Sequence, residues 1–397
     1  PACLLAVAVE VPPHGETAFQ QPQQIHIGYG HTPSEMTVHW TSMQASGQAG
    51  PAAYAPGESF VMYGEREDEL RRVVLGEHFL FRDCGSEGRS YTMHAATMKG
   101  LMPSKVYSYI VGGNASGWSQ PFRFRTAPGS REEVEARLPM TYAIFGDQGD
   151  YNGQTIPSLQ AEARHRTLDV VVHIGDMAYD LDSDNGRNGD SWMRDIEPLA
   201  ATVPYMTAHG NHEANDNFNH YTQRFRNMPS NSGSLTFPEF GTVPNNWWYS
   251  WDSGLVHFVV VSTEVAFFFA DPKREELLSS QESFLRSDLA AVNRTRTPWV
   301  IVTGHRPLYC SSGKDCEEAA TVNRMGLPDG KGGFRFGLEA ILYEFGVDLY
   351  LSGHEHSYER LFDVAPAWDP SRPSRSGKTT RSTADPPATT YIVTGSA

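Results

Sequence analysis

Five short turns after residue 140 carry side chains that can bind metal ions. Each turn follows an apolar run and contains aspartate, asparagine, tyrosine or histidine. In chain order the candidate ligands are Asp147; Asp176 and Tyr179; Asn211; His305; and His354 and His356. Carboxylate and amide oxygens, phenolates and imidazole nitrogens are all donors that metal ions accept in proteins. One such turn is a weak signal, but five in series predict a metal centre.

The spacing within these turns favours two metal ions. A glycine precedes the first ligand of every turn, namely Gly146, Gly175, Gly210, Gly304 and Gly353. Glycine allows the backbone to turn sharply and to approach a crowded centre. His354 and His356 are two positions apart, so an extended segment directs both side chains the same way. A carboxylate can bridge two cations, and two ions roughly 3.5–4 Å apart can hold both the attacking and the leaving oxygen of a displacement.

The five turns need a scaffold that brings them together. Helical patterns separate several of the apolar runs, for example at residues 282–292 and 337–346. Alternating strands and helices predict layers of α and β structure. In such layers the turns at the carboxyl ends of the strands converge on one crevice. We therefore predict one catalytic domain over residues 140–397.

The N-terminal part of the chain has a different pattern. In residues 22–128, short runs such as QIHIGYG and MTVHWTS alternate apolar and polar residues and are separated by turn residues. This pattern predicts a small antiparallel β-sandwich. The region has no cluster of carboxylates and histidines, so we assign it no chemistry. Residues 129–139 are polar and are interpreted as a linker.

The charge balance restricts the class of partner. The formal net charge of the 397-residue chain is −15, which argues against a nucleic-acid partner because such proteins carry basic patches. A small anionic substrate would need a locally positive site, which bound metal would supply. No stretch reaches the roughly 18 unbroken apolar residues of a membrane span.

Several short features favour secretion. The apolar segment CLLAVAV within residues 1–21 is interpreted as a signal-peptide remnant, with a buried strand as the alternative. Asn114 and Asn293 begin N-x-S/T glycosylation sequons. Cys310 and Cys316 can close one loop by a disulfide in an oxidising compartment, or else remain free thiols. We predict a secreted glycoprotein, with the lysosome as an alternative location.

The order of the motifs resembles the metallophosphoesterase superfamily and, within it, the purple acid phosphatases. The motifs are GDQG, GDMAYD, GNHE, GHRP and GHEH. Most members of the superfamily have D-x-H in the first motif. Here Gly149 takes the histidine's place and Tyr179 appears in the second motif, which is the purple acid phosphatase pattern. The segments WYSWD, STEV and GHRPLYC are similar to animal iron/zinc purple acid phosphatase-like proteins.

This resemblance implies both a fold and a reaction. The fold would be an N-terminal all-β sandwich of fibronectin type III kind, followed by an α/β domain in which two sheets lie between helices (αββα). A metal-bound hydroxide would attack the phosphorus of a small phosphate monoester in line. The ferric ion would take Asp147, Asp176, Tyr179 and His356, and a divalent ion, zinc or else iron or manganese, would take Asp176, Asn211, His305 and His354. Asp176 would bridge the two ions, and the Tyr179 phenolate would keep the iron ferric and colour it.

Two features depart from the family pattern. In plant-type members further histidines reach the substrate, but residues 309–320 contain none. His212, which faces the substrate phosphate in the family, is therefore the first candidate for the general acid, and an acidic residue of the 310–318 loop is the second. The chain also stops at TYIVTGSA, where the family continues. We expect that the sheet lacks its final strands or that the sequence is a fragment.

Two other functions fit the same sequence less well. One is a phosphodiesterase or nucleotidase of the same superfamily with a different metal pair, against which Gly149 and Tyr179 argue. The other is a binding module in which the sandwich does the work and the hydrolase has decayed, against which the complete ligand set argues. No motif identifies the physiological ester or the divalent ion. A homodimer is a further expectation.

Overall fold

The computed structural model describes residues 21–43, 59–114, 117–137, 139–149, 153–312, 315–364 and 388–395. The expected signal-peptide remnant lies outside this part of the chain, apart from its last residue.

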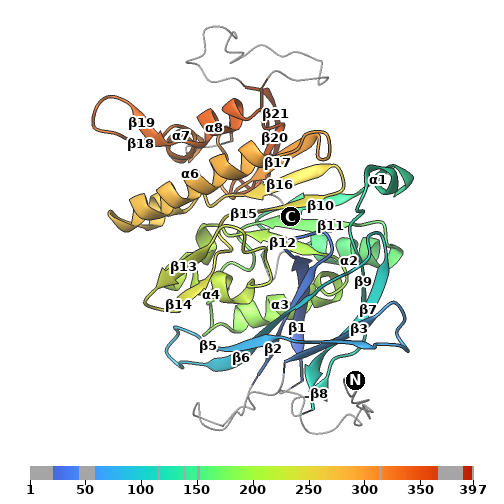
Figure 1. Ribbon diagram of the computed structural model, residues 1–397. Helices are drawn as coiled ribbons and strands as arrows, with labels where there is room; N and C mark the ends of the chain where they lie inside the picture. Colours follow the sequence, from blue (N-terminus) through green and yellow to red (C-terminus); the bar gives the residue numbers. More distant parts are fainter. Residues whose placement is uncertain are drawn as a thin grey trace.

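The N-terminal domain is a sandwich of two antiparallel sheets (Figure 1). The first sheet runs in the order β1 (Gln23–Tyr29), β2 (Met36–Ser42), β6 (Ser90–Met98) and β5 (Glu77–Arg82). The second runs in the order β4 (Arg72–Leu75), β3 (Phe60–Gly64), β7 (Val106–Gly113) and β8 (Gly117–Trp118), and β9 (Phe122–Arg125) also pairs with β7. Alternating residues face the core, where Trp40, Tyr107 and Tyr109 are fully buried.

The segment expected to be a plain linker contains a helix, α1 (Arg131–Arg137). Its sequence explains why. Glu132 and Glu133 lie in the first turn and Arg137 in the last, and these charges complement the helix dipole. Val134 is the residue that α1 buries. The connection between the domains is therefore partly helical rather than irregular.

The C-terminal domain contains two central sheets. A parallel sheet consists of β10 (Tyr142–Phe145), β11 (Val170–Ile174) and β12 (Tyr205–Ala208). A mixed six-stranded sheet runs in the order β15 (Tyr249–Ser253), β16 (Val256–Val260), β17 (Trp299–Thr303), β20 (Leu349–Ser352), β22 (Thr390–Thr394) and β21 (Tyr358–Asp363). The sequence VVVHI of β11 is buried throughout, as expected of a parallel strand covered on both faces.

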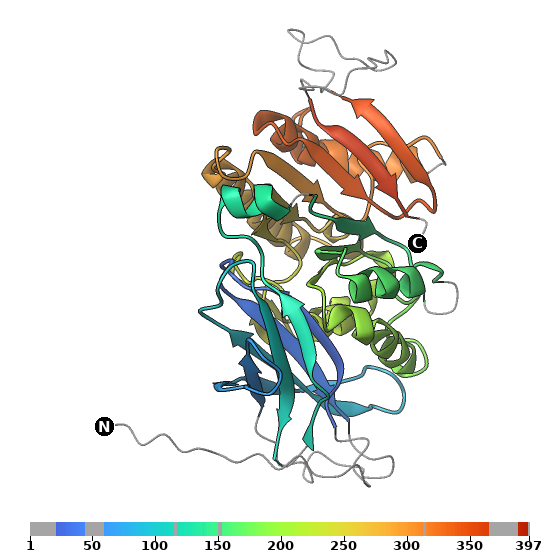
Figure 2. The same ribbon diagram turned by 90° about the vertical axis from the view of Figure 1, so that its right-hand side faces the viewer.

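Helices cover the outer faces of both sheets, which gives the predicted αββα order of layers (Figures 1 and 2). On the side of the sandwich lie α2 (Thr155–His165), α3 (Arg187–Ala200) and α4 (Asn215–Arg224). On the far side lie α6 (Lys273–Ala291), α7 (Asp315–Met325) and α8 (Leu338–Glu344). The remaining elements are the short helices η1 (Asn211–Glu213) and α5 (Val265–Phe268), and the hairpins β13 (Ser234–Phe237) with β14 (Gly241–Pro244) and β18 (Gly326–Pro328) with β19 (Phe334–Phe336).

A buried ion pair lies where the two domains meet. Arg224 of α4 donates to Asp190 of α3 at 2.9 Å, and both side chains are almost inaccessible. Two residues of the sandwich complete the network: Arg89 pairs with Asp190 at 2.7 Å, and the Tyr91 hydroxyl donates to the same carboxylate at 3.0 Å. Removal of one partner from such a pair costs about 3–5 kcal/mol. The sandwich therefore fixes α3, the helix that follows the Tyr179 loop.

Within the described part of the chain, no helix is both long and apolar enough to cross a membrane.

Candidate metal centre

The strands bring all five predicted turns together. Asp147 follows β10, Asp176 follows β11 and Asn211 follows β12, so three turns leave the carboxyl ends of the parallel sheet. His305 follows β17 and His354 follows β20, which are neighbouring parallel strands of the other sheet. The two sheets thus bring together residues that are up to about two hundred positions apart in the chain, in the manner of strand ends in α/β folds.

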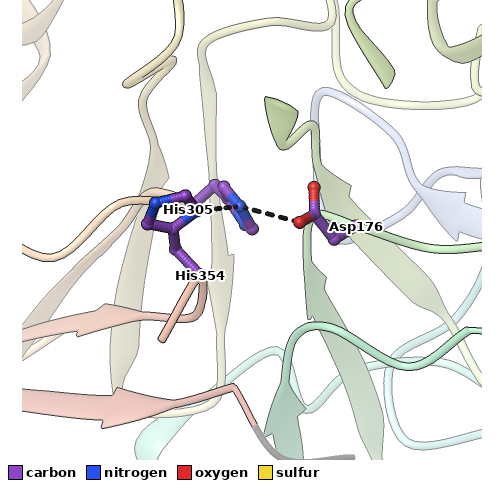
Figure 3. A group of neighbouring side chains, drawn as sticks. All are labelled: Asp176, His305 and His354. Carbon is purple, nitrogen blue, oxygen red and sulfur yellow. Dashed lines mark hydrogen bonds and ion pairs between the residues drawn. The ribbon is translucent and has the colours of Figure 1, made fainter. Parts of the chain in front are cut away.

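One group of side chains converges on a single point (Figure 3). The ligand atoms of Asp176, His305 and His354 all lie within 4.8 Å of one another. His305 is at the centre of the group, because its Nε2 atom is 3.3 Å from Asp176 Oδ2 and 3.2 Å from His354 Nδ1. The same nitrogen is 3.1 Å from Asn211 Oδ1. The four residues expected to hold the divalent ion therefore face one another.

A second group lies beside the first. The Tyr179 hydroxyl is 2.7 Å from His356 Nε2 and 3.3 Å from Asp147 Oδ1. His356 Nε2 is also 3.5 Å from Asp147 Oδ1. The other oxygen of Asp147 accepts the backbone N–H of His354 at 2.8 Å, which ties the two groups together. The structure thus assembles all seven predicted ligands at one place.

The electrostatics of the centre suit bound cations. Burial raises the pKa of Asp147 to about 6, and Asp176 adds to this effect while His305 opposes it. Burial, followed by the charge of Asp147, also raises the pKa of the Tyr179 hydroxyl. Burial and the charge of His305 lower the pKa of His354 to about 3. Its ring is therefore neutral and can offer a nitrogen lone pair to a metal ion. Cations at this position would stabilise the ionised carboxylates and phenolate, so the donor set fits a metal centre.

The structure shows why Gly149 in the first turn accompanies Tyr179 in the second. The φ angle of Gly149 is +67°, and a Cβ atom at this position would lie 3.3 Å from the Tyr179 ring. The glycine therefore leaves the space beside the tyrosine open and adopts a backbone conformation that other residues rarely tolerate. Gly353 has a similar role, because a Cβ atom there would collide with Asp147.

Glu213 is a structural residue of the centre that our sequence analysis missed. Its buried carboxylate accepts the backbone N–H groups of Asp176 at 2.9 Å, Met177 at 2.9 Å and Gly210 at 2.7 Å. Burial and the nearby charge of Asp176 raise the pKa of Glu213 to about 7. Glu213 holds the turn after β11 to the turn after β12. The signal available in the sequence was the glutamate that ends the motif GNHE.

His212 lies at the rim of this centre and has an acidic partner. Its Nδ1 atom is 2.6 Å from Asp180 Oδ1, and its backbone N–H donates to Asp176 at 3.0 Å. Its ring contacts the Tyr179 ring edge to face, with 4.5 Å between the centroids. The side chain is 38% exposed, so an incoming molecule can reach it. Asp180 was not singled out from the sequence, although it ends the motif GDMAYD.

Arg306 brings a fixed positive charge to the same region. Its Nε atom donates to both oxygens of Glu264, at 3.0 and 2.8 Å, and Glu264 is completely buried. Its Nη1 atom donates to His354 Nε2 at 2.9 Å. Two oxygen acceptors in one carboxylate hold a guanidinium firmly. Both residues lie in segments noted in the sequence, GHRP and STEV, but neither had been given a role.

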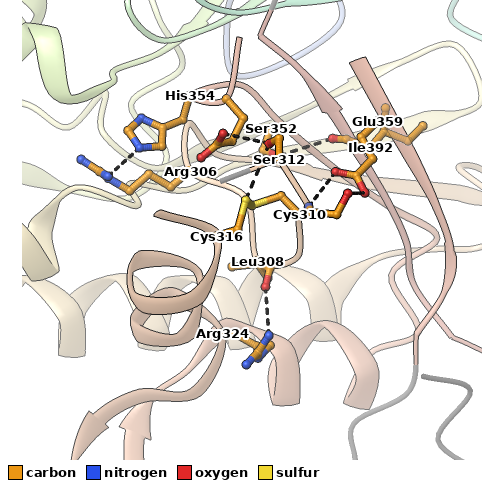
Figure 4. The surroundings of a disulfide bond; sticks show 12 residues. Arg306, Leu308, Cys310, Ser312, Cys316, Arg324, Ser352, His354, Glu359 and Ile392 are labelled. Atoms are coloured by element: carbon orange, nitrogen blue, oxygen red, sulfur yellow. Dashed lines mark hydrogen bonds between the residues drawn. A yellow bond between two sulfur atoms is a disulfide. The ribbon is translucent and has the colours of Figure 1, made fainter. Parts of the chain in front are cut away.

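A disulfide-closed loop borders the centre (Figure 4). Cys310 and Cys316 form a disulfide with a Cα–Cα distance of 5.3 Å. Ser312 of this loop donates to Glu355 at 2.8 Å, next to two of the histidine ligands. Ser311 donates to Glu359 at 2.8 Å. The loop thus supports the segment that carries His354 and His356. The acidic side chains of the 310–318 loop, our second candidates for the general acid, lie outside the described part.

The two sequon asparagines are both on the surface. Asn114 directly follows strand β7, and Asn293 follows helix α6. Both residues are exposed. Asn293 precedes β17, whereas His305 follows the other end of that strand.

Family models match most of the chain. Residues 140–358 match the model described as calcineurin-like phosphoesterase. Residues 22–126 match the model described as the N-terminal domain of purple acid phosphatase.

Individual relatives agree with these matches. Human acid phosphatase type 7 is 39% identical over 348 residues, covering 86% of this chain and 71% of the human protein. A protein of Arabidopsis thaliana named probable inactive purple acid phosphatase 9 is 31% identical, covering 88% of this chain and 55% of its own. The solved structure of a purple acid phosphatase from yellow lupin has a TM-score of 0.67 at 23% identity, covering 95% of this chain and 65% of the lupin chain. The chain described here therefore belongs to the purple acid phosphatase family of the calcineurin-like phosphoesterases.

Proposed function

We propose that this protein is an acid phosphatase that hydrolyses small phosphate monoesters at a centre of two metal ions. The observation that carries the proposal is the convergence of the donor set: the ligand atoms of Asp176, His305 and His354 lie within 4.8 Å of one another, and Tyr179 contacts both Asp147 and His356 beside them. Family membership supports phosphoester hydrolysis in general.

Two groups of residues would hold the two ions, and Asp176 would belong to both groups. Asp147, Asp176, Tyr179 and His356 would hold a ferric ion, and Asp176, Asn211, His305 and His354 would hold a divalent ion, of which zinc is our first choice. Such a pair would supply positive charge for the phosphoryl oxygens and would acidify a water molecule, which makes hydrolysis in acid feasible. Glu213 keeps the two turns of the bridging side in place by accepting three backbone N–H groups.

His212 would move the proton that the leaving group needs. Asp180 accepts a hydrogen bond from its Nδ1 atom, which orients the ring. The Nε2 atom then carries the proton that passes to the oxygen of the departing alcohol. The position of His212 at the exposed rim of the centre supports this role, because the leaving group must be able to depart.

Two measurements on the purified protein test the proposal together. Inductively coupled plasma mass spectrometry gives the bound metals, and hydrolysis of p-nitrophenyl phosphate and bis(p-nitrophenyl) phosphate is followed across pH. We expect about one iron and one divalent ion per chain, with fast monoester hydrolysis in acid and slow diester hydrolysis. Faster diester hydrolysis would make the protein a phosphodiesterase. Two bound metals without hydrolysis of either ester would identify a decayed hydrolase.

We also propose that the protein is secreted and glycosylated. Exposed asparagines at both sequons support this, as does the disulfide, because disulfides persist in oxidising compartments. Treatment of the protein from secretory cells with peptide N-glycosidase F should lower its mass by two glycans. Retention of one glycan in Asn114→Gln and in Asn293→Gln would assign both sites, and an unchanged mass would exclude them.

A further inference from the structure

A cavity of about 310 Å³ lies where the sandwich meets the C-terminal domain. Strand β9 forms one wall, and residues at the ends of α1, α2 and α3 form the others. Five arginines line it: Arg123, Arg125, Arg137, Arg164 and Arg166. The lining contains no aspartate or glutamate, and its remaining surface is largely apolar. Such a pocket is unexpected in a chain whose formal net charge is −15.

Most of these arginines have no acidic partner in the part of the chain that the structure describes. Among the described residues, the only ion pair in the group joins Arg137 to Asp169. Burial and the charge of Arg125 lower the pKa of Arg137, so the like charges are close enough to act on one another. Uncompensated like charges around one cavity repel. An anion in the cavity would remove this repulsion.

The local structure explains part of the arrangement but not all of it. On β9, Phe122 and Phe124 face the core, so Arg123 and Arg125 must face outward. Arg164 lies in the last turn of α2, where a positive charge favours the helix dipole. These reasons place each arginine on the surface of its own element. They do not require that two elements from different domains direct their arginines into the same cavity.

The cavity is distinct from the metal centre. Arg166 and Leu168 precede β11, and Val203 precedes β12. The ligands Asp176 and Asn211 follow the carboxyl ends of the same strands. Since β11 has five residues and a strand rises about 3.3 Å per residue, roughly 15 Å of sheet or more separates the two sites.

We propose that this arginine pocket binds a small phosphate-bearing anion at a site separate from the metal centre. Guanidinium groups present a planar fork of donors that matches phosphate oxygens. The apolar part of the lining would receive the organic part of the ligand, and the volume is within the range of small-molecule sites. The phosphate belongs either to a soluble molecule or to a lipid headgroup, since the chemistry of recognition is the same.

Titration calorimetry of the metal-loaded protein with methylenediphosphonate tests the proposal. The probe resists hydrolysis. The part of its binding that the wild-type protein shows and R123Q/R125Q lacks is assigned to the pocket. We expect this double variant to bind at the pocket at least about tenfold more weakly, as the loss of two charge-assisted contacts implies. The control R66Q/R71Q removes two exposed arginines of the sandwich outside the pocket lining and carries the same change in net charge.

A second double variant controls for the possibility that the first one misfolds. R164Q/R166Q alters the opposite wall of the pocket and should weaken binding to a similar extent, while hydrolysis of p-nitrophenyl phosphate stays unchanged in both pocket variants. Flotation with phosphatidate vesicles separates the two sources of phosphate: vesicle binding with the same arginine dependence assigns the ligand to a lipid, and binding of the free probe alone assigns it to a soluble molecule. Equal affinity in all variants, or no binding of either probe, overturns the proposal.

Discussion

The two sides of the metal centre differ in how firmly the protein holds them. On the side expected to hold the divalent ion, Asp176 and His305 are almost completely buried. His305 also contacts the carbonyl oxygen of Ile174 through Nδ1 at 2.9 Å. On the side expected to hold iron, Asp147 is buried, but Tyr179 is only partly buried and the His356 side chain is 64% exposed. His305 is thus held by the core, whereas Tyr179 and His356 are held largely by contacts with each other and with Asp147.

This difference suggests a division of labour. A buried carboxylate with fixed partners holds its geometry before any ligand arrives, which is what preorganised charge stabilisation requires. A partly exposed tyrosine and histidine would leave room for a substrate and would tune an ion bound beside them. Changes on the buried side should therefore remove the centre, whereas changes on the exposed side should alter its properties.

The largest effect is expected from Asp176→Asn. The substitution removes the charge that both cations share, so we expect activity to be abolished and both metals to be lost together. Metal analysis and p-nitrophenyl phosphate hydrolysis measure this, with Asp68→Asn on the exposed surface of the sandwich as control. Two metals per chain with normal turnover would show that Asp176 is not the bridge.

The next effect is expected from His212→Ala at the rim. The protein should fold and keep both metals, and turnover should fall by roughly 10²–10⁴, the usual scale for a lost general acid. Asp180→Asn should lower turnover less, because the imidazole remains and only its orienting partner is weakened. His78→Ala removes an exposed histidine of the sandwich and serves as control. Loss of a metal from the His212 variant would make this residue a ligand.

The sequence indicated the candidate ligands but not the groups that position them. The first candidate ligand of each turn lies at the end of an apolar run, next to a glycine, and such local patterns need no knowledge of the fold. Glu213 and Arg306 lie in two of these turns as well, but nothing in the local sequence indicates their roles. Besides the nearby Gly210, Glu213 accepts from backbone groups 36 and 37 positions away, and Arg306 pairs with Glu264, 42 positions away. Those contacts exist only after the strands have been arranged in the sheets.

The same reasoning applies to the domain boundary. The alternation within residues 22–128 was sufficient to predict a sandwich, and the strand–helix alternation was sufficient to predict α/β layers, because both follow from periodicity along the chain. Helix α1 was missed because its short polar sequence resembles a linker. Only the fold shows that Val134 is buried. The shared arginine pocket was missed for a related reason, since it requires β9 and α2 to be neighbours.

An intermediate effect is expected from Glu213→Gln. The two carboxylate oxygens accept three N–H groups, and the amide nitrogen of glutamine would replace one acceptor by a donor. The turn of Asp176 should then shift, and metal affinity should fall by about 10–100-fold, as is common when a group supporting a ligand is changed. Competition for the divalent ion with a chelator measures this, with Glu344→Gln on the surface as control. Unchanged affinity would mean that the turns hold without Glu213.

The smallest effect on activity is expected from Tyr179→Phe. The fold should persist, because one oxygen is lost and the ring still packs beside Gly149. Iron would lose its anionic phenolate donor, so the visible charge-transfer band should disappear and the iron should become easier to reduce. Turnover should fall only in part, since the phenolate takes no part in bond breaking. Visible spectra, redox titration and turnover of the iron-loaded variant measure these three properties.

The contacts of the Tyr179 hydroxyl lie within the group of candidate ligands and not in the packing of its own loop. Its two hydrogen-bonding partners are Asp147 and His356, both candidate ligands, and not a backbone carbonyl. Tyr63→Phe is a matched control, because the Tyr63 hydroxyl donates to the carbonyl oxygen of Lys99 within the sandwich and its loss should leave the spectrum unchanged. If Tyr179→Phe kept the visible band, the hydroxyl would not be an iron ligand. The exposed side of the centre would then be an ordinary metallophosphoesterase site with a tyrosine beside it.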